Sequence, residues 1–341
     1  MSDLTYPFGT EPPAAGALVE VAPGVRWWSL PVPGPLRQVN GYLLDDDGGT
    51  VAVDTGFNTD DALAAWRDLL GGALASAPVT RVVCTHFHPD HSGLAGWLAR
   101  MSDAPLVMTR VEWLMLRLLV ADARPEVPAE MIAHWRGAGW SGEEIDRAAA
   151  HGWARFGKLV ARLPFGCTIV DEDDRIAIGG HDWRVVIGSG HSPAHLCLVD
   201  EGRGLFLAGD QVLPRISPNV SVTAIEPEGD PLGAWLASIA SLRALPADLL
   251  VLPGHGAPFR GLHPRLDAIE AEHRSRLDAL AVHLAEPARA RDCFPILFRR
   301  PIGEDMLGMA TGEALAHLHH LRIQGRAVRE TRDGVWWWRA A

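Results

Sequence analysis

Short apolar runs separated by turn residues make up much of the first 260 residues. From Val19 to Val53, such runs are broken by Pro-Gly and Asp-Gly-Gly and predict a β-meander. Aliphatic and β-branched runs farther along predict individual buried strands. These runs are Arg81–Thr85, Trp183–Ile187, Leu205–Ala208 and Leu249–Leu252. Helical spacing of apolar positions predicts helices over Asp60–Leu70, N-capped by Asp60 or Asp61, and over Ser92–Met101.

The pattern becomes helical throughout residues 109–163, which we interpret as an insertion. Val111–Val120 predicts a strongly apolar helix, and further helical stretches surround Trp135 and Ala148. Its large apolar side chains can line an acyl pocket, pack against the body or form a dimer interface. For each of these side chains, packing against the body is favoured over a position in an acyl pocket. They are Trp113, Met115, Met131, Trp135, Trp140, Trp153 and Phe156.

The two ends of the chain differ from the body between them. Residues 1–16 are rich in Pro, Gly and Ala, which predicts a flexible lead-in. Residues 261–341 contain helical runs at 263–286 and 310–323, followed by a hairpin pattern around Thr331–Gly334. We therefore expect a separate C-terminal domain built from helices and a β-hairpin.

The segment from His86 to His91 (His-Phe-His-Pro-Asp-His) holds four side chains that can bind a metal, directly after a predicted strand. His86 and His88 alternate, so an extended backbone points both imidazoles to one side. Asp90 and His91 follow a proline that bends the chain, and can face a second point. Imidazoles with a carboxylate and no thiolate favour zinc, iron or manganese in a reactive site.

Matching residues follow four other predicted strands. Asp54 follows Thr50–Val53, and the remaining three follow the strand runs given above. Each is flanked by glycine, which lets the backbone approach closely. These three are His191, Asp210 and His255.

This ordered set of five motifs resembles the metallo-β-lactamase superfamily, over roughly residues 17–260. The resemblance implies an α/β fold, an αβ/βα sandwich with the metal site along one edge of two facing sheets. It also implies two divalent metal ions, expected to be zinc with iron or manganese as alternatives. His86, His88 and His191 would bind one ion, Asp90, His91 and His255 the other, and Asp210 would bridge them. Asp54 would orient ligand imidazoles without binding metal.

The order of the whole chain is similar to the branch that includes β-lactamase-like protein 2 and glyoxalase II-like enzymes. In that branch a winged-helix domain follows the metal-binding body. Arginines of such a domain can contact nucleic acid, yet here acidic residues nearly cancel them, so packing or dimerisation is favoured. Secreted members that hydrolyse β-lactams commonly have Cys where this chain has Asp210, which argues against that activity.

We expect the histidines outside the motifs to have structural roles. We expect His195 to be a strand residue or a support for the ligands. His317, His319 and His320 lie on one predicted helix at a spacing that cannot direct all three to one point. They are expected at the surface or at a domain contact.

Composition narrows location and partners. The net charge of −11 disfavours extended nucleic-acid binding, although it does not exclude it. We find neither a membrane-spanning apolar stretch nor a signal-peptide pattern, so we expect a cytoplasmic protein without a membrane partner. Cys84 and Cys197 lie in apolar runs and are expected in the core.

The predicted function is hydrolysis by a metal-bridging hydroxide, with Asp90 and Asp210 as catalytic carboxylates. A small acyl substrate, most plausibly a thioester, fits the apolar insertion and the acidic body. Endoribonuclease action on single-stranded RNA is the main alternative, and lactone hydrolysis another. The segment from Asp210 to His255 is too short for the RNA-processing domain that some nuclease relatives insert there. A one-iron persulfide dioxygenase or a binding module fits the complete ligand set less well.

Overall fold

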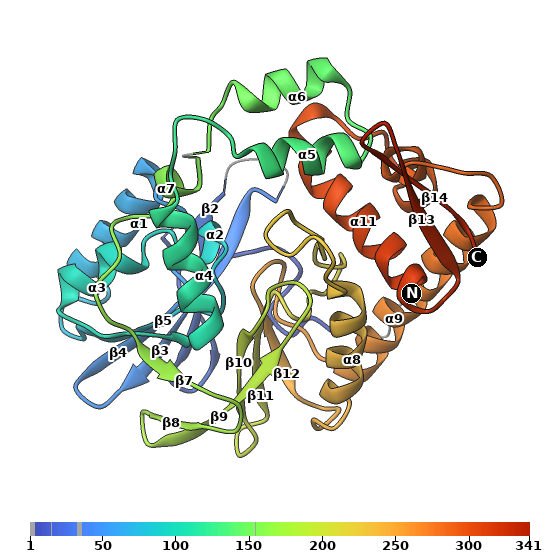
Figure 1. Ribbon diagram of the computed structural model, residues 1–341. Helices are drawn as coiled ribbons and strands as arrows, with labels where there is room; N and C mark the ends of the chain where they lie inside the picture. The colour runs from blue at the N-terminus through green and yellow to red at the C-terminus, as the bar shows by residue number, and fades with distance from the viewer. Residues whose placement is uncertain (1–3, 15, 33–35, 154) are drawn as a thin grey trace.

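Two β-sheets face each other and carry helices on their outer sides (Figure 1). The computed structural model describes residues 4–14, 16–32, 36–153 and 155–341. The first sheet has the strand order β1-β2-β3-β4-β5-β6-β7 and changes from antiparallel to parallel pairing at β4. Its strands are β1 (Val19–Ala22), β2 (Val25–Pro31), β3 (Gln38–Asp46), β4 (Gly49–Val53), β5 (Val79–Val83), β6 (Leu106–Thr109) and β7 (Thr168–Val170).

The second sheet follows the first in the sequence and has the order β12-β11-β10-β9-β8. Its strands pair antiparallel except β11 and β12, which are parallel. They are β8 (Arg175–Ile178), β9 (His181–Gly188), β10 (His195–Asp200), β11 (Leu205–Gly209) and β12 (Leu250–Pro253). Each sheet is thus formed by one continuous part of the chain.

Alternation along the strands divides the interior into three layers. Val51 and Val53 point into the space between the sheets, whereas Ala52 points towards the outer helices. On the second sheet, Leu205 and Leu207 face the first sheet and Phe206 faces the outer helices. Because both faces of each sheet are covered, the central strands are apolar on both sides, as the sequence indicates.

Helices near the ligand motifs differ slightly from prediction. Helix α1 (Asp60–Gly71) is capped by the Thr59 hydroxyl, which accepts from the Ala62 amide, and not by Asp60 or Asp61. The helix predicted over Ser92–Met101 is two helices, α2 (Pro89–Ser92) and α3 (Ala95–Ser102). Pro89 starts α2 because its fixed φ suits a first helical position. A side chain at Gly93 would strike backbone atoms of Pro89 and Gly56.

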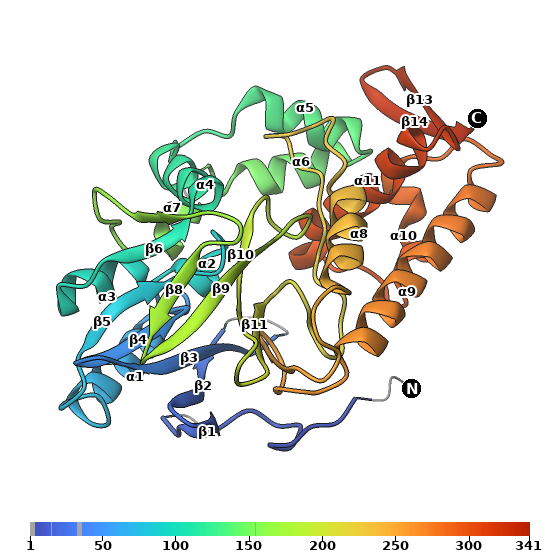
Figure 2. The same ribbon diagram turned by 90° about the horizontal axis from the view of Figure 1, so that it is seen from below.

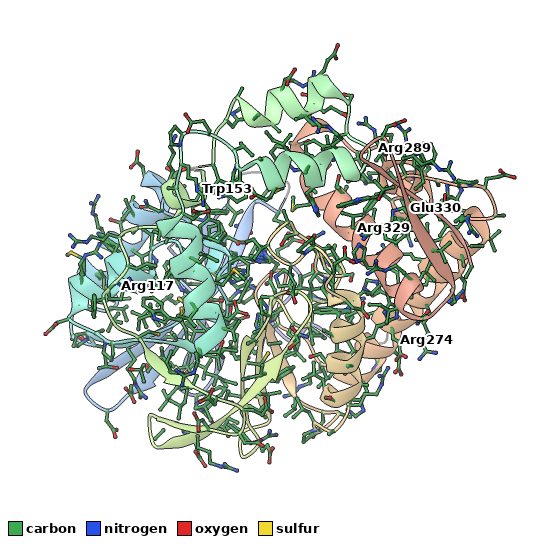
Figure 3. All side chains as sticks on the ribbon, in the orientation of Figure 1. Arg117, Trp153, Arg274, Arg289, Arg329 and Glu330 are labelled. Carbon is green, nitrogen blue, oxygen red and sulfur yellow. The ribbon has the colours of Figure 1, made fainter. Side chains whose placement is uncertain are left out.

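The predicted insertion is helical and spans from the first sheet to the C-terminal region (Figure 1). Within it, the Trp153 indole donates to the carboxylate of Asp122, the residue that follows its first helix, at 3.1 Å; Trp153 is labelled in Figure 3. On the far side, the Trp140 indole donates to Thr311 Oγ1 at 2.9 Å. The helices are α4 (Arg110–Ala121), α5 (Ala129–Gly137), α6 (Gly142–Ala149) and α7 (Arg155–Leu159).

The C-terminal region packs against the outer face of the second sheet, where α8 (Pro231–Leu242) and α9 (Leu262–His283) also lie. Its elements end in a hairpin, as predicted. Arg289 and Arg329, labelled in Figure 3, lie over the indoles of Trp337 and Trp336, respectively. The elements after α9 are η1 (Ala290–Cys293), α10 (Phe294–Leu297), η2 (Glu304–Met306), α11 (Leu307–Ile323), β13 (Ala327–Arg332) and β14 (Val335–Ala340).

The three α11 histidines are buried, which corrects the surface interpretation. His317 meets His273 of α9, with Nε2 and Nδ1 3.3 Å apart, and His320 contacts Asp230 at the start of α8. His319 packs against Trp338 of the hairpin. The contact of His320 with Asp230 agrees with the alternative interpretation, a contact between domains, whereas His317 and His319 contact residues of the C-terminal region itself.

Part of the predicted flexible lead-in is anchored. Thr5 pairs with Arg260 through backbone hydrogen bonds, and Tyr6 packs against the core. Figure 2 shows the N-terminal segment as a dark blue trace along the lower edge of the molecule. Residues 1–3 and 15 of that segment lie outside the described residues. Within the described ranges, we find no helix with the length and apolar character needed to cross a membrane.

Candidate metal centre

All the predicted ligands come together at one edge of the two sheets. The first sheet supplies His86, His88, Asp90 and His91, which follow β5, and the second supplies the others after β9, β11 and β12. The strands that precede them end at this edge, so loops that are far apart in sequence converge there. Three groups of side chains lie close enough to hold an ion: His86–His88–His191, His86–His91–Asp210 and Asp90–His91–His255.

The first group consists of imidazoles alone. His86 Nε2 lies 2.9 Å from His88 Nδ1 and 3.2 Å from His191 Nε2. Metal–nitrogen bonds of about 2.0–2.1 Å place the ligands of one ion roughly 3.0–3.4 Å apart. These two separations are close to those expected around a single ion.

The Asp90–His91–His255 group combines an imidazole from each sheet with a carboxylate. His255 Nε2 lies 3.3 Å from Asp90 Oδ2, and His91 Nε2 lies 3.6 Å from the same oxygen. Asp210 lies between the two groups, because its Oδ2 is 3.6 Å from His191 Nε2 and 3.5 Å from His255 Nε2. This is the position that a bridging carboxylate requires.

Asp54 lies behind the first-sheet ligands and fixes two of their rings. Its Oδ2 accepts from His91 Nδ1 at 2.7 Å, so the neutral form of His91 would have its lone pair on Nε2, which faces the centre. Its carboxylate also accepts the Thr85 hydroxyl proton at 2.9 Å, which leaves that oxygen free to accept from His86 Nδ1 at 3.0 Å. One carboxylate therefore sets the tautomer of His91 directly and of His86 through Thr85.

Backbone carbonyls set the tautomers of the histidines that follow strands of the second sheet. His191 Nδ1 donates to Asn219 O at 2.8 Å, and His255 Nδ1 donates to Gln38 O at 2.7 Å. Each ring consequently presents the lone pair of Nε2 to the centre. Asn40 and Tyr42 of β3 donate to Pro253 O, which holds the loop that carries His255 against the first sheet.

Several inward-facing atoms are buried without a hydrogen-bond partner among the described residues. They are His91 Nε2, His255 Nε2 and Asp210 Oδ1. A buried polar atom left unpaired costs about 1–3 kcal/mol, so such atoms call for an additional ligand. Oxygen and nitrogen donors with fixed outer contacts fit divalent metal ions.

The charges of the two groups differ. Burial lowers the pKa of His86 and His191, and brings that of His88 to about 3, so these rings are neutral ligands at neutral pH. Burial would raise the pKa of Asp90, but His91 and His255 outweigh it and lower the value to about 2. Asp210 is likewise held ionised by the same two histidines. The carboxylates therefore supply the negative charge that compensates a cation.

Two glycines and His195 allow Asp210 to lie this close to its neighbours. A Cβ at Gly254 would meet Asp210 Oδ1 at 2.1 Å, and one at Gly209 would meet His195 Cε1 at 2.5 Å. His195 stacks on His86, with ring centroids 4.7 Å apart, and its Nε2 accepts from the Asp210 amide at 3.0 Å. His195 is thus the support that the sequence indicated.

A family model described as "Metallo-beta-lactamase superfamily" matches residues 34–255, which include the five motifs, β3 to β7 of the first sheet and the whole second sheet. The chain belongs to the metallo-β-lactamase superfamily. It is a hydrolase of that superfamily, with a mixed α/β fold and His/Asp groups able to hold a dimetal site. A second model, "Metallo-beta-lactamase-like, C-terminal domain", matches residues 277–341.

Similar proteins include a solved structure that covers nearly the whole chain, a β-lactamase domain protein from Burkholderia ambifaria. It is 39% identical, covers 99% of this chain and 98% of its own, and has a TM-score of 0.91. The probable metallo-hydrolase YqjP of Bacillus subtilis is 26% identical, over 86% of this chain and 91% of its own. The superfamily assignment therefore includes the C-terminal region.

Two partial matches are to proteins whose names state an activity. An atrochrysone carboxyl ACP thioesterase from Aspergillus fumigatus is 23% identical over 71% of this chain and 42% of its own length. A ribonuclease Z from Streptomyces avermitilis is 33% identical over 32% of this chain and 27% of its own. These matches span only part of each relative.

Sequence reasoning missed two residues that hold the ligand loops, and the first is Glu112 of α4. Its side chain is buried, and its carboxylate accepts from the amides of Phe87 and Ala194. A single glutamate in an apolar helix looks like part of a solvated face, so the sequence carries no signal for it. Asn219 was missed for a similar reason, because its backbone carbonyl is what holds His191.

The aromatic residues of the insertion largely follow the packing interpretation. Trp113 and Phe156 pack with the outer helices of the first sheet, and Trp140 packs against the C-terminal region. Trp135 stacks on Trp140 with ring centroids 5.1 Å apart. These contacts favour the packing interpretation for four of the seven residues.

Proposed function

We propose that the protein is a dinuclear metal-dependent hydrolase acting on a thioester or a related acyl ester. The observation that supports the two-metal assignment is the arrangement of seven convergent side chains. Their outer atoms are held by the protein, while inner atoms such as His91 Nε2 and Asp210 Oδ1 have no partner among the described residues.

His86, His88 and His191 would hold one ion, and Asp90, His91 and His255 the other, with Asp210 shared. Two divalent ions supply Lewis acidity for the acyl oxygen and lower the pKa of water towards neutrality. Zinc suits these nitrogen and oxygen donors, as do iron and manganese.

Protein groups would orient and receive protons around this site. Asp90 is ionised at neutral pH and lies at the inner face, where it can accept a hydrogen bond from the attacking water. Water adds to the acyl carbon, the bond from that carbon to sulfur or oxygen breaks, and the leaving group takes up a proton. Asp54, Gln38 and Asn219 keep the histidines in the tautomers that bind metal.

Support for an acyl substrate comes from charge and from similarity. The thioesterase match extends over 71% of this chain, more than twice the share covered by the ribonuclease match. The net charge of −11 also disfavours a polyanion. A small acyl compound therefore fits the chain better than RNA.

The C-terminal region gives little support to nucleic-acid binding. We infer that residues 17–260 carry the chemistry and that residues 261–341 form a domain of winged-helix type with a packing role. The four arginines at positions 322–332 each face a carboxylate at 2.6–2.9 Å, which offsets part of their charge. They are Arg322 and Arg329 with Glu228, Arg326 with Asp278, and Arg332 with Glu330.

Metal analysis tests the two-ion assignment directly. The chain purified without chelators is expected to contain close to two ions per molecule, and His88→Ala to abolish turnover while retaining the fold. His151→Ala, an exposed histidine of the insertion, serves as the matched control. A single iron combined with oxygen consumption would contradict hydrolysis.

A parallel substrate screen tests the acyl assignment. Acyl-CoA esters, lactones, a chromogenic cephalosporin and single-stranded RNA would be compared with the same metal-loaded preparation. We expect thioester hydrolysis that His88→Ala removes. RNA cleavage without thioester hydrolysis would reverse the assignment in favour of the endoribonuclease.

A further inference from the structure

Glu112 connects the helical insertion to both loops that carry the three-histidine group. It lies in α4, and its side chain has no exposed surface. Its Oε2 accepts from the Phe87 amide at 2.9 Å, and Phe87 separates His86 from His88. Its Oε1 accepts from the Ala194 amide at 2.7 Å, three residues after His191.

A second contact from the same segment holds the Ala194 loop. The hydroxyl of Thr109, the residue before α4, donates to Ala194 O at 2.7 Å. The amide and the carbonyl of Ala194 are therefore both bound by the start of the insertion. Because charged acceptors form stronger hydrogen bonds than neutral ones, the Glu112 carboxylate is the main element of this clamp.

The Asp90–His91–His255 group is held differently. Asp54 fixes His91 and the Gln38 carbonyl fixes His255, and both come from the first sheet. Neither contact involves α4. The insertion therefore supports the loops of the three-histidine group, whereas the first sheet supports His91 and His255.

We propose that Glu112 is a positioning residue for the His86–His88–His191 group, through which the insertion sets the affinity of that half for metal. This inference rests on the proposed two-metal centre. Loss of the carboxylate would let the two ligand loops separate, whereas the Asp90–His91–His255 group would keep its own supports.

Glu112→Gln tests this proposal without any substrate. The new amide group places an N–H opposite a backbone N–H, so one clamp contact becomes repulsive. Stepwise competition with a chromophoric chelator is expected to show one ion bound about 10- to 100-fold more weakly and the other unchanged. Glu143→Gln, at an exposed position of the same insertion, is expected to leave both affinities unchanged.

Background variants identify which ion is affected. In a His255→Ala chain, Glu112→Gln should lower the affinity for the remaining ion by the same factor. In a His191→Ala chain, it should add almost no further loss, because the group it supports is already incomplete. Equal loss at both ions, or no loss at either, would overturn the proposal.

Amide hydrogen exchange provides a test that needs neither metal nor substrate. In the metal-free wild-type chain, the Phe87 and Ala194 amides should exchange slowly, and Glu112→Asp, which is one methylene shorter, should accelerate both. Exchange at the rate of exposed amides in the wild type would overturn the clamp. A wild-type chain that binds one ion would contradict the proposed function, while exchange at these amides would still decide the role of Glu112.

Discussion

At the scale of single residues, the centre depends on the absence of side chains as much as on ligands. Gly254 follows β12 and lies against Asp210, the residue between the two metal-binding groups. No side chain fits there, because a Cβ would come within 2.1 Å of Asp210 Oδ1 and 2.8 Å of His91 Cε1.

We therefore expect Gly254→Ala to displace Asp210 and to reduce metal affinity by about 10- to 100-fold, with a comparable loss of kcat/KM. Chelator competition and steady-state kinetics measure the two effects. Gly308→Ala is the control, since a Cβ at that α11 position meets no atom within 4 Å. Unaltered metal affinity in Gly254→Ala would show that Asp210 can move without weakening metal binding.

The residues that could be predicted from sequence share one property. Asp54, His191, Asp210 and His255 are metal-binding residue types that directly follow apolar runs, and the structure brings them together. Glu112 has no such context, because its partners are backbone amides 25 and 82 positions away. Contacts to backbone atoms leave no mark on the sequence of the partner, which is why that clamp was missed.

At the scale of elements, strands were predictable and helix ends less so. The continuous apolar run Leu205–Ala208 predicts a strand with two buried faces, as observed for β11. The break between α2 and α3 was not predicted, because it depends on the backbone that packs against Gly93. Tertiary contacts of this kind override local spacing.

Helix α11 shows how far burial can depart from the expectation for a histidine-rich helix. The side chain of His319 has no exposed surface and lies 5.2 Å from the ring of Trp338. Neither ring nitrogen has a partner among the described residues. Burial lowers the pKa of this imidazole to about 4, so the folded protein keeps it neutral.

His319→Phe is expected to stabilise the protein by about 1–3 kcal/mol at pH 7, because it removes unpaired buried nitrogens without changing the ring volume greatly. His319 is protonated in the unfolded chain below pH of about 6.5 and in the folded protein only below about 4. The free energy of unfolding of the wild-type protein therefore decreases as the pH falls from about 6.5 to about 4.

The advantage of the variant should accordingly grow by about 1.4 kcal/mol per pH unit between pH 6.5 and 4. Chemical denaturation at several pH values measures it, and His151→Phe at an exposed position provides the comparison. A variant less stable than wild type at pH 5 would show that His319 has a compensating contact.

At the scale of the whole molecule, the ligands come from both sheets. The part of the chain that forms β1 to β7 supplies His86, His88, Asp90 and His91, and the part that forms β8 to β12 supplies the other three. Ions bound at this edge would therefore connect the two halves of the sandwich.

Removing the ions should destabilise the fold as a whole. Free metal at 100 times its Kd stabilises the native state by about 2.7 kcal/mol for each independent site. We expect chelation to lower the Tm and to broaden unfolding, with recovery when zinc is returned, as measured by calorimetry. An unchanged Tm after verified metal removal would contradict the connecting role of the ions.

The division of ligands between two successive parts of the chain also bears on how the protein is made. During synthesis the first sheet is complete while residues beyond β7 are still being added, and it then offers His86, His88, Asp90 and His91 without their partners. His191 must follow before the three-histidine group exists, and His255 before the other group does. Retention of both ions consequently marks a chain whose translation has passed β12 and whose two sheets have already docked.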